Sequence, residues 1–221
     1  VWKSIIGLDK DEFIPGLKRL TDTIHKYDVK VAAQILHGGR SASSFFSKTR
    51  PVSPSSLAHI NIKQKPHALT IPEIKKVIEG FVAATARVKK AGFDAVEIHG
   101  GMGYLINQFL SKATNKRKDR YGGSLKNRIN FAKEMVIAIR KKVGKGYPII
   151  FRMSGADFVD EGLKIDESVV IAKELEKAGV DAFNVSPGWH ESRTPIMLMA
   201  IPRMSYIFLS EKIKDNVKVP V

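Results

Sequence analysis

The sequence has 221 residues, of which 37 are Lys or Arg and 22 are Asp or Glu, so its formal net charge is +15. Its 43% apolar and 27% charged residues are typical of a globular chain, and the absence of cysteine excludes disulfides, thiolate metal sites and a cysteine nucleophile from this stretch. It contains no run of about 18 apolar residues, which excludes a membrane-spanning helix.

The first predicted strand covers residues 29–36, after an N-terminal helix, and ends at the sequence His37-Gly38-Gly39-Arg40. A long polar loop with Ser and Pro residues follows. Thr70-Ile71-Pro72-Glu73 has the pattern of a capping box with Pro in the first turn. It opens a helix whose apolar residues recur at 3.6-residue spacing until Gly92.

Strands and helices alternate over the rest of the chain. Ser124 and Asp166 are the predicted N-caps of two helices, which end before Gly144 and Gly179, and a further helix is centred on residues 210–214. The predicted strands between them cover residues 94–99, 148–152, 181–186 and 217–221. Strands separated by helices imply right-handed crossovers and a parallel sheet.

One short pattern occurs twice. Residues 90–95 (KAGFDA) resemble residues 177–182 (KAGVDA), and both lie where a helix ends and a strand begins. Repeated corners suggest a barrel of equal units. The alternative, a doubly wound open sheet, would usually carry a G-x-G-x-x-G fingerprint, which is absent. We therefore predict a (β/α)₈ TIM barrel that is incomplete, with residues 1–221 as one partial domain containing about strands 3 to 7.

In such a barrel the functional residues follow the carboxyl ends of the strands. Gln34 stands in an otherwise apolar strand and either pairs with backbone or reads the edge of a heterocycle. Arg152 ends a strand and serves either a structural ion pair or an anionic ligand. Tyr104 follows a Gly-rich turn and is either a packing residue or a proton donor, and His190 is either surface or a titratable group on a rigid loop.

Other chemistries have weaker signals. His37, His99 and His190 lack metal-ligand spacing and a nearby acidic cluster, so we predict no metal site. No nucleophile elbow and no P-loop occur. The lysines are spread along the chain and poor in aromatic neighbours, which favours a solvated coat over a nucleic-acid surface, although a polyanion-binding remnant without catalysis is an alternative.

Four motifs, in order, resemble those of the old yellow enzyme family, FMN-dependent oxidoreductases on an eight-fold barrel. They cover residues 34–40 (QILHGGR), 100–110 (GGMGYLINQFL), 114–124 (TNKRKDRYGGS) and 188–193 (GWHESR). The last motif is similar to the branch that holds 2,4-dienoyl-CoA reductase, NADH oxidases and trimethylamine dehydrogenase. The resemblance runs from about residue 13 to residue 221.

The resemblance implies roles for the matching positions. Gln34 would bind the pyrimidine edge of FMN, and Arg152 would stabilise the reduced flavin. Tyr104 would be the proton donor, assisted by His190, in the NAD(P)H-driven reduction of an activated C=C bond such as that of a 2,4-dienoyl-CoA or an enoate. The substrate would meet His99, Trp189 and Arg193. An NADH oxidase or an amine dehydrogenase is the alternative within the family.

Two positions depart from the family pattern. Met102 stands where members commonly have His or Asn, and Lys112-Ala113 stands where they have Pro or Arg. We expect a cytoplasmic protein with a small-molecule substrate and neither a nucleic acid nor a membrane as partner; a homo-oligomer is left open. Because the sequence starts without Met and stops within a predicted strand, we expect a fragment whose longer parent is open to FAD and an iron–sulfur cluster.

Overall fold

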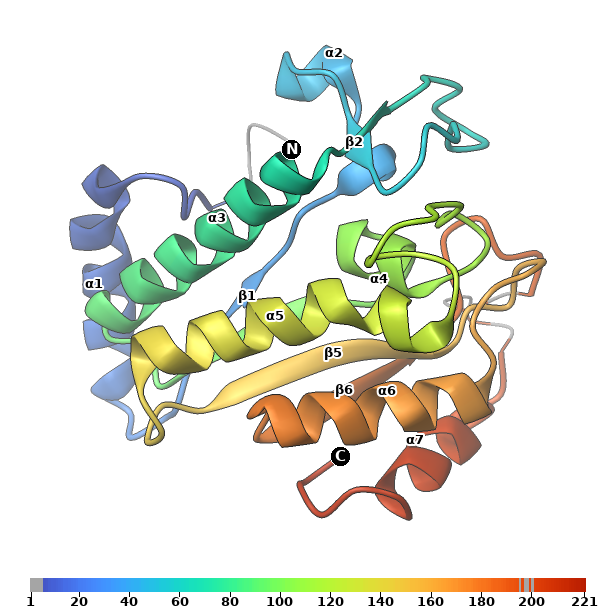
Figure 1. Ribbon diagram of the computed structural model, residues 1–221. Coiled ribbons are helices and arrows are strands. Elements are labelled where there is room, and N and C mark those ends of the chain that lie inside the picture. Colours follow the sequence, from blue (N-terminus) through green and yellow to red (C-terminus); the bar gives the residue numbers. More distant parts are fainter. Residues whose placement is uncertain (1–5, 195, 197–198, 200) are drawn as a thin grey trace.

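A computed structural model describes residues 6–194, 196, 199 and 201–221 of the chain. Within them, the main feature is a four-stranded parallel sheet in the order β1-β4-β5-β6 (Figure 1). Its strands are β1 (Ala32–Ile35), β4 (Ala95–Gly100), β5 (Ile149–Ala156) and β6 (Ala182–Pro187). The prediction of a parallel sheet built from strand–helix units is confirmed.

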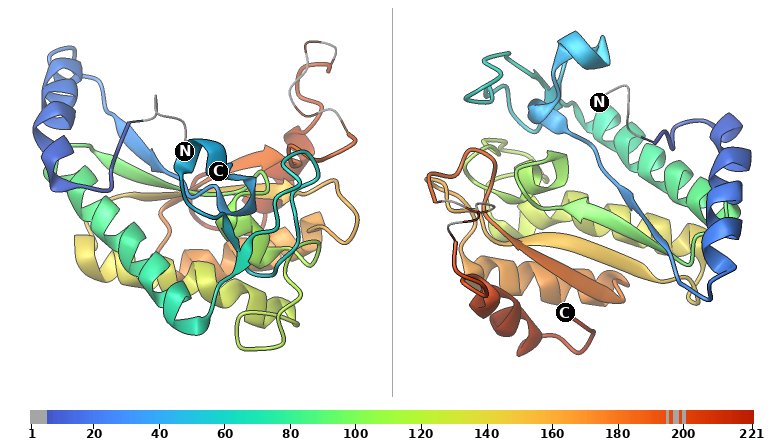
Figure 2. Two further views of the ribbon diagram at one scale, coloured as in Figure 1. Left: turned by 90° about the horizontal axis from the view of Figure 1, so that it is seen from above. Right: turned by 180° about the vertical axis from the view of Figure 1, so that it is seen from behind.

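The longer helices cover one face of this sheet (Figure 1). They are α1 (Ile14–His25), α3 (Ile71–Lys90), α5 (Leu125–Val143), α6 (Ile165–Ala178) and α7 (Ile207–Lys214). Seen from behind, β4 and β5 lie in front of α3, α5 and α6, so these helices leave the other face of the two strands uncovered (Figure 2). The sheet is therefore packed on one side and open on the other.

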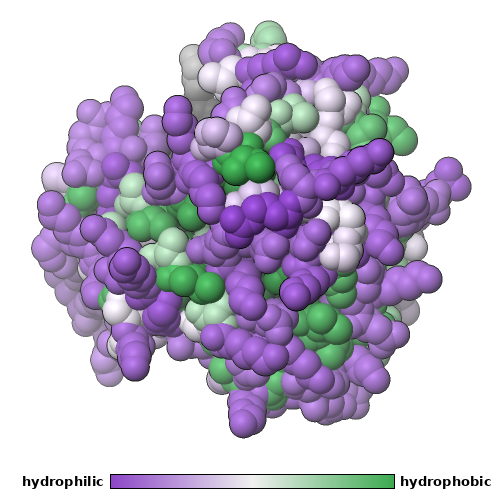
Figure 3. All heavy atoms as spheres, viewed as in Figure 1, coloured by the Kyte–Doolittle hydropathy of each residue, from purple (hydrophilic) through white to green (hydrophobic). Residues whose placement is uncertain are grey.

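The hydrophobic core lies between the sheet and the helices. Ile98 of β4 and Phe151 of β5 are fully buried in one cluster with Phe131 and Ile139 of α5 and Leu175 of α6. Burial of these apolar side chains is the main force that holds the two layers together. The outer face of the helices is mostly hydrophilic (Figure 3), as expected for a coat of lysines.

Local signals set the helix ends. Thr70 and Glu73 form the predicted capping box, in which the Glu73 N–H donates to Thr70 Oγ1 over 3.4 Å and the Thr70 N–H donates to Glu73 Oε2 over 2.7 Å. That backbone hydrogen bond is the largest cause that lowers the pKa of Glu73 to about 2. Ser124 caps α5 as predicted. Asp166 was expected to cap α6 but lies in its first turn, where a carboxylate still favours the positive end of the helix dipole.

The two similar corners are the same structural device. The Asp94 carboxylate accepts the Val31 N–H over 2.9 Å, and the Asp94 N–H donates to the Val31 carbonyl over 2.9 Å. Asp181 makes the same pair with Ile149, at 2.7 Å and 2.9 Å. Asp181 thus fixes the first residue of β5, and Asp94 fixes the residue directly before β1, which sets the register at the amino-terminal edge of the sheet.

Several short elements were not predicted. They are η1 (Asp11–Phe13), η2 (Gly39–Ser41), α2 (Ser44–Ser47), β2 (Val52–Ser53), β3 (His67–Ala68) and α4 (Leu105–Leu110). β2 and β3 pair with each other in parallel, inside the segment that was predicted as a loop. Arg117 holds this segment in place, since its guanidinium donates to the carbonyls of Pro54 and Leu69 over 3.0 Å and 2.5 Å.

The predicted strand at residues 217–221 is not formed, so the described sheet has four strands rather than the five expected. The segment runs beside β6, and the Phe183 N–H donates to the Pro220 carbonyl over 2.9 Å. A single hydrogen bond does not make a ladder, so residues 217–221 are not a strand in this structure.

Candidate active site

Three of the predicted site residues come together at the carboxyl ends of the strands. The Tyr104 hydroxyl and His190 Nε2 are 3.1 Å apart and share a hydrogen bond. The Tyr104 ring also stands edge-on to the His99 ring, with 5.0 Å between ring centroids. His99 belongs to β4, Tyr104 follows the next turn, and His190 lies on the loop after β6. The fold therefore assembles a cluster whose members come from well-separated parts of the sequence.

His99 is neutral near pH 7. Its burial, followed by the positive charge of Arg152 and then by His190, lowers its pKa to about 4. His99 and Arg152 are direct partners across β4 and β5. His99 Nδ1 accepts the Gly101 N–H over 3.3 Å, so the single proton of the neutral ring is on Nε2. His99 is thus a fixed N–H donor rather than a cation.

Tyr104 keeps its proton. Burial raises the pKa of its phenol, and the charge of Arg152 opposes that shift only in part. A protonated phenol paired with an imidazole is chemically competent to give a proton to a carbon or oxygen atom and to be reprotonated afterwards.

The guanidinium of Arg152 has hydrogen-bonding capacity that the described residues do not use. Its Nη2 approaches the sulfur of Met102 at 3.8 Å, and its buried Nε has no hydrogen-bond partner within the described residues. No described carboxylate lies within ion-pair distance of it. Because a guanidinium cannot lose its charge, this arrangement fits an anionic ligand better than a structural ion pair.

Gln34 belongs to a polar row across the open face of the sheet. Its amide nitrogen donates to Glu97, and Asn184 donates to the other oxygen of Glu97 over 2.9 Å. The row links β1, β4 and β6. Since its nitrogen is engaged, Gln34 offers its amide oxygen to a ligand N–H.

The turn before Tyr104 is tightly built. Met102 and Gly103 both have positive φ angles, 57° and 78°, a conformation that is costly for Met and natural for Gly. A Cβ on Gly103 would also lie 3.0 Å from the Trp189 ring. Trp189 is 2% exposed and lies against this turn, with the Arg40 guanidinium 5.7 Å from its centroid.

The loop that carries His190 is tied to the segment after β1. Glu191 forms a mostly buried ion pair with Arg40 and accepts the Ile60 N–H over 2.9 Å. Trp189, predicted to bind substrate, lies beneath this loop, whereas Arg193, predicted for the same role, is exposed. The structure does not bring either of them into the Tyr104 cluster, and both roles stay predictions.

The sequence alone assigned no role to Arg40, Glu191, Asn107, Gln108 or Asp157. Four of them lie in the recognised motifs, and Asp157 follows β5, but their partners are far away in the chain. The available signal was the pair Asn107-Gln108 in the otherwise apolar helix α4, where both amides are fully buried. Buried amides must be hydrogen-bonded, which marks them as framework residues.

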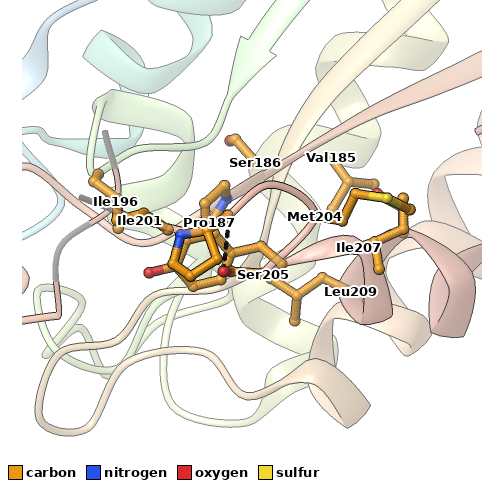
Figure 4. A pocket seen from close by; sticks show the side chains of 12 residues that line it. Val185, Ser186, Pro187, Ile196, Ile201, Met204, Ser205, Ile207 and Leu209 are labelled. Carbon is orange, nitrogen blue, oxygen red and sulfur yellow. Dashed lines mark hydrogen bonds between the residues drawn. The ribbon is translucent and has the colours of Figure 1, made fainter. Parts of the chain in front are cut away.

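A separate pocket of about 410 Å³ lies between the end of β6 and the start of α7 (Figure 4). Val185, Pro187, Ile196, Ile207 and Leu209 are among its mainly apolar lining residues, which do not include the Tyr104 cluster. Within the described part of the chain, no group of three or more His, Asp or Glu side chains could hold a metal ion. None of the helices described has both the length and the apolar character needed to cross a membrane.

Comparisons with known proteins identify the family and the fold. The family model described as NADH:flavin oxidoreductase / NADH oxidase family matches residues 2–220. A metal reductase of Desulforamulus reducens is 44% identical over 97% of this chain and 32% of its own length. An NADH oxidase of Thermoanaerobacter brockii is 40% identical over 98% of this chain and 34% of its own length.

Among solved structures, a 2-naphthoyl-CoA reductase in complex with 2-naphthoyl-CoA superposes with a TM-score of 0.92 and 32% identity. The match covers 97% of this chain and 35% of that protein. The chain therefore spans about a third of the length of these relatives. The predicted fold class, an incomplete (β/α)₈ barrel, is confirmed.

Proposed function

The chain belongs to the NADH:flavin oxidoreductase / NADH oxidase family, and from this premise we propose that it supplies the substrate-facing part of an FMN-dependent enzyme. The proposed reaction uses NAD(P)H as reductant and reduces an activated C=C bond of a small molecule. The observation that carries the proposal is the Tyr104–His190 hydrogen bond of 3.1 Å beside the neutral His99. It is an arrangement suited to proton donation next to a carbonyl-binding N–H.

The residues at the strand ends fit a flavin. The buried Nε of Arg152 has no partner among the described residues, which suits a group that carries negative charge. Gln34 presents an amide oxygen on the open face of the same sheet. We propose that these two residues hold the ring of FMN, which when bound supplies the hydride chemistry of the family. A fixed cation at that point favours the reduced, anionic ring.

The proton chemistry is assigned to side chains of this chain. Tyr104 Oη holds the proton that is delivered to the substrate, and His190 keeps that hydroxyl oriented through Nε2. His99 Nε2–H would polarise the carbonyl that activates the C=C bond, with no charge of its own to desolvate. Trp189 and Arg193 remain proposed substrate contacts on the His190 loop.

The Tyr104→Phe variant of the full-length protein tests the proposal. We expect turnover with an enone or enoyl thioester to fall by about 100-fold or more, the range of general acid catalysis. Flavin reduction by NAD(P)H should change little, because that half-reaction needs no proton from the phenol. Stopped-flow absorbance separates the two half-reactions.

A matched control is Tyr27→Phe, which removes a hydroxyl from a side chain that is 77% exposed. It should leave both half-reactions unchanged. Equal losses in both half-reactions of Tyr104→Phe would contradict the proton-donor role.

An NADH oxidase is the second candidate, favoured by the relative of that name at 40% identity. The position of Met102 beside Arg152 adds to it, because a thioether offers a substrate carbonyl no useful hydrogen bond. Steady-state assays would decide between the reactions of this family. O₂ and an enoyl thioester are tested as electron acceptors for the reduced enzyme, and an amine is tested as electron donor for the oxidised enzyme.

A further inference from the structure

Asp157 is a buried carboxylate that the proposed reaction does not use. It follows the last residue of β5 and is fully buried. Its Oδ1 accepts the Asn107 Nδ2–H over 3.1 Å and its Oδ2 accepts the Leu163 N–H over 2.8 Å. No described Lys or Arg forms an ion pair with it. A charge-bearing group without a counter-ion in the interior is expensive to keep, which calls for a reason.

The first consequence concerns the turn before Tyr104. Because the Asn107 nitrogen donates to Asp157, the Asn107 oxygen must face the other way. There it accepts the Gly103 N–H over 2.7 Å and the Ser154 hydroxyl over 3.2 Å. Ser154 Oγ in turn accepts the Met102 N–H over 3.1 Å. The two positive-φ residues that place Tyr104 are thus held by one network, whose orientation Asp157 sets.

The second consequence concerns the loop that carries His190. Burial raises the pKa of the Asp157 carboxyl, and the nearby Trp189 indole N–H is the last of four hydrogen-bonding groups that oppose this shift. The indole N–H meets no acceptor at full hydrogen-bonding geometry within the described residues. The Gly188 N–H donates over 2.7 Å to the carbonyl of Ala156, the residue before Asp157. The Trp189 ring also packs on Gly103, so the loop and the turn meet above the same carboxylate.

We propose that Asp157 is a positioning residue for the Tyr104–His190 pair. One buried carboxylate fixes the Asn107 amide under the Tyr104 turn and supports the Trp189 ring beneath the His190 loop. The proposal rests on the proposed function for the chemical meaning of the pair. The hydrogen-bond network itself stands apart from that function.

The pattern of donors and acceptors gives a sharp test. In Asp157→Asn, one of two acceptor oxygens becomes an NH₂ donor, so either Asn107 or the Leu163 N–H loses its partner. If Asn107 rotates to compensate, its own NH₂ then faces the Gly103 N–H. The swap variant Asn107→Asp/Asp157→Asn restores each of these hydrogen bonds. Its carboxylate at position 107 accepts from Gly103, Ser154 and the introduced amide at position 157, and the oxygen of that amide accepts the Leu163 N–H.

The variants are made in the full-length, flavin-loaded protein. We expect Asp157→Asn to lower kcat for reduction of an enoyl thioester by roughly 10- to 100-fold, the cost of misplacing a catalytic group by about 1 Å. KM, FMN content and reduction by NAD(P)H should stay within about twofold. The swap variant should recover kcat to within about threefold. Asp160→Asn, which alters an exposed residue on the same loop, should change nothing.

An NMR measurement provides a readout that does not depend on activity. The Trp189 indole N–H signal, identified by its loss in Trp189→Phe, should shift in Asp157→Asn and return toward its original position in the swap variant. It should not move in Asp160→Asn. An unchanged indole signal and unchanged kcat in Asp157→Asn would overturn the proposal.

The Tyr104→Phe background separates the two hypotheses. If Asp157 acts through Tyr104, Asp157→Asn should cost little further turnover once the hydroxyl is gone. Multiplicative losses would overturn the positioning role, even if Tyr104 is the proton donor.

If Tyr104→Phe alone keeps full turnover, the proposed function fails, while the indole signal and the swap still decide the role of Asp157. Should Asp157→Asn not fold, a folded swap variant with recovered turnover supports the proposal and an inactive one contradicts it.

Discussion

Three features of the site act together on the protonation of the His99 ring. His99 is 4% exposed, its strand partner is the Arg152 cation, and His190 lies nearby. Each of these disfavours a second proton on the ring, with burial as the largest cause. A neutral imidazole at physiological pH can donate a hydrogen bond from Nε2 and does not compete with Arg152 for an anion.

We expect His99 to titrate with a pKa of about 4 in the folded protein, against 6.5 for an unperturbed histidine. Between these pH values the unfolded chain binds the proton and the folded chain does not. The stability that the neutral ring contributes is therefore complete above pH 6.5 and is lost as the pH falls to about 4. The loss is at most about 3 kcal/mol, on the scale of about 1.36 kcal/mol per pKa unit.

An NMR titration of the His99 imidazole measures this midpoint directly. Arg152→Met should raise it, because the largest neighbouring charge is gone, whereas Arg193→Met, which removes an exposed cation, should leave it in place. A midpoint near 6.5 in the unaltered protein would contradict the assignment of a neutral, buried ring.

The two KAG-x-DA corners are the clearest case of one sequence pattern making the same contact twice. Asp181 accepts the Ile149 N–H over 2.7 Å and also pairs with the Arg140 guanidinium. Asp94 accepts the Val31 N–H in the same way and pairs with Lys30 at 3.2 Å. These hydrogen bonds at the start of β5 and β1 hold the strands in register at the edge of the core.

We expect Asp181→Ala to lower the free energy of unfolding by about 2 kcal/mol, since a strand N–H loses its charged acceptor. Asp94→Ala should act in the same direction. Asp22→Ala breaks only an exposed i,i+4 pair with Lys18 and should cost less than about 0.5 kcal/mol. Urea unfolding curves measure all three, and an Asp181→Ala loss no larger than that of Asp22→Ala would show that the corner does not hold the strand.

At the level of elements, local chemistry was readable from the sequence and long-range chemistry was not. The cap at Thr70 and the stop at Gly179 depend on neighbouring residues, so their pattern predicted them correctly. Helix α4 was missed because Asn107 and Gln108 interrupt its apolar pattern. Their hydrogen bonds, to Asp157 and to the Gly103 carbonyl, are visible only in the fold. Likewise, the motifs pointed to Tyr104 and His190, but only the fold reveals that Glu191 holds the His190 loop through Arg40.

Over the whole molecule, the open face of the sheet is the feature that matters for cofactor binding. Gln34 and Arg152 reach the ring of a flavin from this face in the proposed arrangement, from strands that are two apart in the sheet. The described sheet has four strands, with β1 and β6 as its edges. In barrels of this class a phosphate is held by the loops after strands seven and eight, so the ring contacts and the phosphate contacts belong to different parts of the barrel.

We expect the 221-residue chain, expressed alone, to bind FMN poorly or not at all, because ring contacts without a phosphate site leave the dianion of FMN in water. Gel filtration followed by absorbance of protein and flavin in the same fraction gives the flavin-to-chain ratio. A longer version that includes segments matching the remaining two-thirds of the relatives should approach one flavin per chain and lose it in part on Arg152→Met. One bound flavin per 221-residue chain would contradict this prediction. It would mean that Gln34, Arg152 and their neighbours bind the cofactor tightly enough without the phosphate loops.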